Sequence, residues 1–126
     1  MKKIDAFTQG YIATAFWSSS DESNDQGGEP LDRNYDISDL SPGALQVMIR
    51  DCAKFQENNA DDLANSENSD SRCGHDFWLT RNGHGAGFWD GDYPEGIEGR
   101  LTTASDAFGE CSLYIGDDKQ IYHSDG

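Results

Sequence analysis

The stretch from Gly74 to Asp90 reads GHDFWLTRNGHGAGFWD and is the densest group of aromatic, glycine and titratable residues in the chain. Its segments 75–81 and 87–90 are rich in aromatic residues, as β-strands are. Residues 82–86 between them begin with Asn-Gly, a dipeptide that favours turns with positive φ. The stretch therefore predicts a β-hairpin. The apolar side chains that should be buried together on one face of it are Phe77, Leu79 and Phe88.

Two helices are predicted before this stretch. Residues 4–17 repeat apolar residues three and four positions apart, as an amphipathic helix does. Ser41 is a suitable N-cap and Pro42 a suitable first helical residue, so a second helix should begin there and run to about Leu63.

The chain after Asp90 predicts a short helix and a second hairpin. Apolar spacing over 101–108 indicates the helix, which Gly109 should end. Segments 112–115 and 120–122 flank a turn at 116–119 and form the hairpin. The predicted order is ααββαββ. The fold class is α+β, with two N-terminal helices packed on an antiparallel sheet made of two hairpins and a short helix between them.

The length of 126 residues predicts one domain, covering 1–126. Residues 18–39 should form a long acidic loop and residues 64–72 a polar linker, because both are rich in Ser, Asn and Asp without apolar periodicity. No run approaches the roughly 18 apolar residues of a membrane span, and the first residues lack the apolar block of a signal peptide. We therefore expect a soluble, cytoplasmic protein.

The three cysteines, Cys52, Cys73 and Cys111, are odd in number and show no C-x-x-C spacing. This usage favours a reducing compartment over a disulfide framework or a zinc knuckle. Cys52 lies on the apolar stripe of the second helix and should be buried, whereas Cys73 adjoins the polar linker and should be exposed.

The charge balance restricts the possible partners. The chain has 24 Asp and Glu against 9 Lys and Arg, a net charge of −15. Such a surface repels nucleic acids and anionic membranes, so a partner should be a basic protein. An expected surface of about 6,700 Å² gives one net charge per roughly 440 Å², whereas duplex DNA carries one per about 110 Å². Imitation of DNA therefore requires the acids to crowd onto one face.

The favoured hypothesis is an acidic interaction protein that occupies the basic nucleic-acid-binding surface of another protein, as a DNA mimic does. The candidate partner-binding acids are Asp21, Glu22, Asp25, Asp61, Asp62, Asp90 and Asp92. A further alternative is that the acidity serves only solubility or adaptation to salt.

The second functional hypothesis is a small metal-dependent or acid–base enzyme. His75, His84, Asp90 and Asp92 are residue types that bind metals, and Asp76 or Asp90 could orient His84 as a base. The spacing from His75 to His84 is not one of the recurring zinc patterns, and the chain has no nucleophile motif. We therefore predict no catalytic residue, no metal and no cofactor, and keep His75, Arg81 and His84 as residues of a possible functional loop.

The segment from Gly74 to Asp90 resembles a family of small bacteriophage and prophage proteins that have no assigned activity. Weaker similarity covers most of the rest of the chain. The pattern of the family places a glycine after the Asp pair of the last hairpin, where this chain has Lys119. The resemblance implies a phage protein in a bacterial cytoplasm that inhibits a host defence or nucleic-acid-processing protein, and it implies no catalytic residues.

Overall fold

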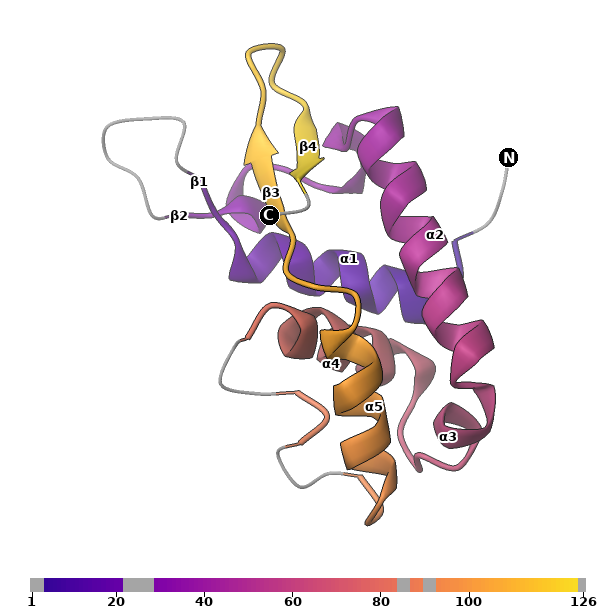
Figure 1. Ribbon diagram of the computed structural model, residues 1–126. Coiled ribbons are helices and arrows are strands. Elements are labelled where there is room, and N and C mark those ends of the chain that lie inside the picture. Colours follow the sequence, from indigo (N-terminus) through magenta and orange to yellow (C-terminus); the bar gives the residue numbers. More distant parts are fainter. Residues whose placement is uncertain (1–3, 22–28, 84–86, 90–92, 125–126) are drawn as a thin grey trace.

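The computed structural model describes residues 4–21, 29–83, 87–89 and 93–124. Within them the chain forms five α-helices and two small antiparallel sheets. The helices are α1 (Ala6–Ser18), α2 (Pro42–Asn58), α3 (Ala60–Ala64), α4 (Asp70–Arg81) and α5 (Ile97–Asp106), with 3-10 helices η1 (Leu31–Arg33) and η2 (Ile37–Asp39). The strands are β1 (Ser20–Asp21), β2 (Glu29–Pro30), β3 (Ser112–Ile115) and β4 (Ile121–Ser124). Figure 1 shows α1 and α4 across the middle of the molecule, α2 along one side and the β3–β4 hairpin projecting at the end opposite α5.

The predicted architecture, with helices packed on an antiparallel sheet of two hairpins in the order ααββαββ, is wrong. The described residues are mostly helical, and residues 70–81 form helix α4 instead of the first strand of a hairpin. Every residue from Asp76 to Arg81 is buried. A helix that is surrounded by other elements shows no apolar–polar periodicity, and its sequence then resembles that of a buried strand. The aromatic residues of 75–81 favoured a strand in the prediction, whereas packing against other segments stabilises this part of the chain as a helix.

The two ends of α4 carry recognisable caps. The Ser69 hydroxyl accepts a hydrogen bond from the backbone N–H of Arg72 and caps the first turn. At the other end Gly83 has a φ of 69° and donates its backbone N–H to the carbonyl of Thr80. The Asn-Gly pair thus ends a helix, a role that needs the same positive φ as a hairpin turn.

The other predicted elements agree better with the structure. Helix α1 matches the predicted 4–17, and α2 begins at Pro42 with the Ser41 hydroxyl as its cap. Helix α2 ends at Asn58, where Asn59 donates to the carbonyl of Phe55, and the short α3 follows. Helix α5 occupies Ile97–Asp106, and the last hairpin pairs Leu113 with His123 and Tyr114 with Tyr122.

Both predicted connecting segments contain structure. The 18–39 segment, whose residues 22–28 lie outside the described part, holds the two-residue strands β1 and β2 and the helices η1 and η2. The predicted linker 64–72 ends early, because α4 begins at Asp70.

Helices α1 and α4 form the most extensive contact in the fold, and glycines make it possible. A Cβ atom added to Gly74 would lie 1.9 Å from the Phe7 carbonyl oxygen, and one added to Gly10 would lie 2.2 Å from that of Ser71. The backbones of the two helices therefore touch at positions that only glycine can occupy.

The buried side chains form one apolar cluster around this crossing. Phe55 stacks on Phe77 with ring centroids 4.1 Å apart, and Phe88 stacks on Phe55 at 5.8 Å. Burial of Phe77, Leu79 and Phe88 is confirmed, although Phe77 and Leu79 are on a helix. All three cysteines are free and buried, so Cys52 matches its prediction and the expected exposure of Cys73 is wrong.

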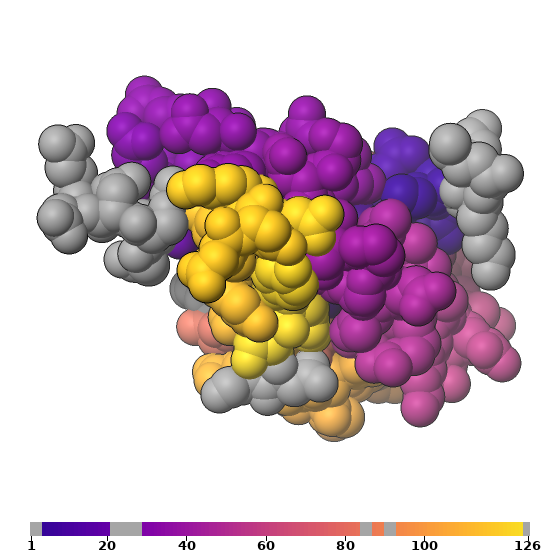
Figure 2. All heavy atoms as spheres, turned by 90° about the horizontal axis from the view of Figure 1, so that it is seen from above, coloured from indigo at the N-terminus to yellow at the C-terminus, as the bar shows by residue number. Residues whose placement is uncertain are grey.

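The β3–β4 hairpin packs on the segment that precedes α2. The backbone N–H of Ser41 donates to the carbonyl of Ile121, and Leu40 forms a parallel bridge with Ile121. Figure 2 shows the hairpin lying against this segment and α2. No helix in the described part of the chain is long and apolar enough to cross a membrane.

Candidate functional site

Helix α1 exposes a face without charge. Its thirteen residues include no Asp, Glu, Lys or Arg, although 26% of the whole chain is charged. Phe7, Tyr11 and Ala15 are buried in the core. The exposed side chains of α1 are Ala6, Gln9, Ala13 and Trp17. Their spacing of three and four residues places them in one stripe along the helix.

The segment from 31 to 37 forms a wall opposite part of this stripe. Leu31 anchors it, since its side chain is buried and its backbone N–H donates to the carbonyl of Ser19 at 2.9 Å. The far end is held where Leu40 and Ser41 meet Ile121 of the hairpin. The wall is therefore fixed to the fold at both ends.

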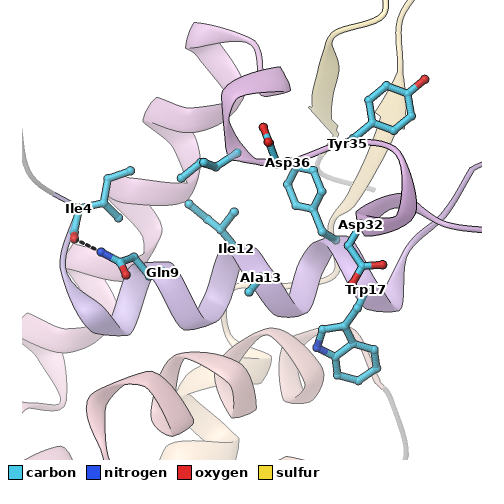
Figure 3. Close-up of a pocket in the computed structure, with 10 residues that line it drawn as sticks. Ile4, Gln9, Ile12, Ala13, Trp17, Asp32, Tyr35 and Asp36 are labelled. Carbon is cyan, nitrogen blue, oxygen red and sulfur yellow. Dashed lines mark hydrogen bonds between the residues drawn. The ribbon is translucent and has the colours of Figure 1, made fainter.

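Between the wall and α1 lies an open groove of about 540 Å³. Figure 3 shows Ile4 and Gln9 at one end of α1, Trp17 at the other, and Tyr35 on the wall. The residues that line the groove are Ile4, Gln9, Ile12, Ala13, Phe16, Trp17, Asp32, Tyr35, Asp36 and Ile37. Trp17 is 46% exposed and Ile37 39%, so large apolar side chains of the groove remain in contact with water.

The wall gives the groove a negative edge. The Ser38 side chain and its backbone N–H both donate to the Asp36 carboxylate and lower its pKa, which keeps this group ionised at neutral pH. Asp32, the other carboxylate that lines the groove, is also exposed. The only basic residue between 29 and 41 is Arg33, which pairs with Glu29 at 3.5 Å.

His75 lies beside Trp17, with ring centroids 5.8 Å apart. Its Nδ1 is 2.9 Å from Oδ1 of the fully buried Asp76, while Tyr93 and Arg72 donate to Oδ2 of the same carboxylate at 2.7 and 3.0 Å. Burial and the Asp76 carboxylate raise the pKa of the Tyr93 phenol. Three side chains therefore contact the Asp76 carboxylate, which ties α4 to the segment that contains Tyr93.

Arg81, kept above as a residue of a possible functional loop, lies at the end of α4 and is buried in the core. Its Nη1 donates to Asp51 Oδ2 and to the Tyr11 hydroxyl, both at 3.0 Å. Its Nε and Nη2 donate to the carbonyls of Gly109 and Phe108 at 2.8 and 3.1 Å. Arg81 thus joins α1, α2 and α4 to the chain that follows α5, which is a structural role.

The alternative metal or acid–base site falls largely outside the described residues. His84, Asp90 and Asp92 belong to the undescribed segments, and His75 has the contacts given above. In the described ranges, no group of three or more His, Cys, Asp or Glu side chains is arranged to hold a metal ion. The enzyme hypothesis stays an untested alternative.

Among the candidate partner-binding acids, the ones that the structure describes do not gather in one place. Of these residues, Glu22, Asp25, Asp90 and Asp92 lie outside the described part. Asp21 is in β1 and Asp61 in α3, and Figure 1 shows β1 and α3 at opposite ends of the molecule. Arg100 binds the Asp62 carboxylate through Nε and Nη2, at 3.0 and 2.8 Å, and lowers its pKa. The charge of Asp62 is therefore compensated within the protein.

The groove was not predicted from the sequence. Its wall and floor are separated by some 20 residues of the chain, so only the tertiary fold brings them together. One signal was present in the sequence, however. The apolar residues of α1 lie on more sides of the helix than burial of a single face requires.

Comparisons with models of known protein families, with curated proteins and with solved structures give no match for this chain.

Proposed function

We propose that this chain is an acidic interaction protein that binds a basic partner protein. The observation that carries the proposal is the groove on α1, where exposed apolar side chains face a wall that carries acidic residues. Exposed apolar grooves of this kind are typical of sites that bind other proteins. The net charge of −15 favours a basic partner and speeds the encounter with it.

In its finer form the proposal is that the partner is a host defence or nucleic-acid-processing protein, as the phage resemblance implies. The surface of 7157 Å² carries one net charge per roughly 480 Å², against one per about 110 Å² for duplex DNA. Asp21 and Asp61 lie far apart, which argues against one continuous DNA-like face that includes both residues. Imitation of DNA therefore depends on a local group of acids.

The test is capture of partners from a bacterial lysate on the immobilised protein at about 50 and about 500 mM salt, with and without duplex DNA as competitor. The control is an unrelated protein of equal net charge. The proposal predicts proteins that are retained only by this chain and are lost at high salt. If the control captures the same proteins, the acidity serves solvation. If specific partners remain bound in excess DNA, the interaction proposal holds and imitation of DNA is wrong.

A further inference from the structure

We propose that the groove on α1 binds a basic amphipathic helix of the partner, with the apolar side chains of that helix on α1 and its Lys or Arg side chains at Asp32 and Asp36. This inference rests on the proposed function, because it assigns the surface and the chemistry of the segment that is bound.

The floor of the groove has the form that a helix requires. From Gln9 to Trp17 the exposed stripe covers about 12 Å, or slightly more than two helical turns. Ala13 lies in the middle and is the smallest side chain of the stripe in the groove, so another backbone can approach α1 closely there. An amphipathic helix laid along such a stripe would present apolar residues at i, i+3, i+4 and i+7.

The wall determines the charge of the segment. Asp32 and Asp36 line the groove, and their exposed carboxylates stand on the same side of it as Tyr35. Arg33 is directed to Glu29 and so compensates a different carboxylate. A helix with cations along one edge would therefore pair with the wall while its apolar stripe covers Ala13 and Phe16.

Trp17 closes one end of the groove with an aromatic face. Its ring packs beside His75, and His75 in turn is held by the buried Asp76 carboxylate. This series of contacts fixes the indole near Asp32, as Figure 3 shows. An aromatic face beside a carboxylate is a favourable site for a guanidinium or ammonium group. The cation nearest this end should therefore contribute most to specificity.

The experiment measures the affinity of two synthetic helical peptides by fluorescence anisotropy at low salt. Both peptides carry the same number of Lys and Arg residues. One has Leu at the stripe positions i, i+3, i+4 and i+7, and the other has Ala at those positions. The inference predicts that the Leu peptide binds at least about tenfold more tightly than the Ala peptide, since only the Leu peptide can fill the apolar floor.

Matched variants of the protein locate the binding site. Ala13→Lys places a cation on the floor of the groove, and Ala53→Lys makes the same change at an exposed position of α2. Ala13→Lys should weaken the Leu peptide about tenfold or more and Ala53→Lys less than about twofold. Asp32→Asn should weaken it severalfold and Asp61→Asn, on the distant α3, should have little effect. Circular dichroism should show that all four variants are folded.

The outcomes separate the two proposals. If neither peptide binds at low salt, the groove does not bind a basic helix, and the proposed function is then decided by the capture of partners from lysate. If the two peptides bind equally, or if the Ala13→Lys and Ala53→Lys variants behave alike, charge alone drives binding. The groove is then not the site, while the proposal of a basic partner stands.

Discussion

Replacement of Arg81 by methionine should destabilise the fold strongly without any change at the surface. Arg81 is 4% exposed, and it provides hydrogen bonds to Asp51, Tyr11 and two backbone carbonyls. Its guanidinium also lies 5.4 Å from the centre of the Phe108 ring. Methionine keeps much of the volume but removes every one of these donors.

The expected loss of stability follows from the polar groups that Arg81→Met would leave without a partner. Asp51 is itself buried, with 7% exposure, and its carboxylate would lose its buried partner. Removal of one member of a buried ion pair costs about 3–5 kcal/mol. Two carbonyls also lose their donors, but these costs overlap with the first and do not add in full. We expect a loss of about 4 kcal/mol, or roughly 15 °C in Tm for a chain of this length.

The assay is urea unfolding followed by circular dichroism, with Arg50→Met as the matched control. Arg50 contacts the same Asp51 carboxylate at 3.4 Å, but its side chain is 67% exposed, so its loss should cost less than about 0.5 kcal/mol. Adding Asp51→Asn to Arg81→Met should recover part of the loss, because the unpaired charge is removed. A loss below about 1 kcal/mol for Arg81→Met would refute the structural role of this residue.

Three other changes test the fold. Gly74→Ala should lower the free energy of unfolding in urea by about 3 kcal/mol or more, because the added Cβ would clash with the Phe7 carbonyl. Gly99→Ala is the control: its Cβ meets nothing within 4 Å, so it should stabilise α5 by about 0.5–1 kcal/mol. Equal effects of the two changes would contradict the close helix crossing. Lys119 has a φ of 66°, so Lys119→Gly should raise stability by about 0.5 kcal/mol, and a decrease would argue against this turn. Burial raises the pKa of the Tyr11 phenol and of the Cys52 thiol well above their ordinary values of 10.0 and 9.0. As the pH rises, these groups ionise in the unfolded chain before they ionise in the folded protein, so the stability should be complete below about pH 9 and fall above it. Equal urea midpoints at about pH 8 and about pH 10.5 would show that the two groups are not buried.

The elements that local sequence determines were predicted well. Ser41 and Pro42 define the start of α2 by capping and by a fixed φ, both of which act within a few residues. The last hairpin likewise follows from strand residues on either side of a short turn. Such signals do not depend on the rest of the fold.

Helix α4 could not be predicted in this way, because its environment is created by other segments. Gly74 meets α1, Phe77 meets α2, and Arg81 meets the chain after α5. With neighbours on nearly every side, the helix has no polar face that would reveal its period. Arg81 was likewise kept as a residue of a possible functional loop, because its burial depends on partners in other segments that the sequence does not reveal.

The candidate site depends on tertiary structure even more. Asp32 and Trp17 line one groove only because Leu31 is anchored beside the end of α1. The sequence indicated an acidic protein with a basic partner, but it did not indicate where apolar and acidic groups would meet.

The most direct test of the central claim is a titration of the nitrogen-15-labelled protein with the Leu-stripe basic peptide, followed by NMR chemical shifts. The account predicts that the largest changes fall on the amides of Gln9 and Ala13, on the Trp17 indole and on residues 32–37. The Trp78 indole, whose ring is buried in the core, serves as the internal control and should move little. Changes concentrated on α3, or spread evenly over the acidic residues, would contradict binding in the groove.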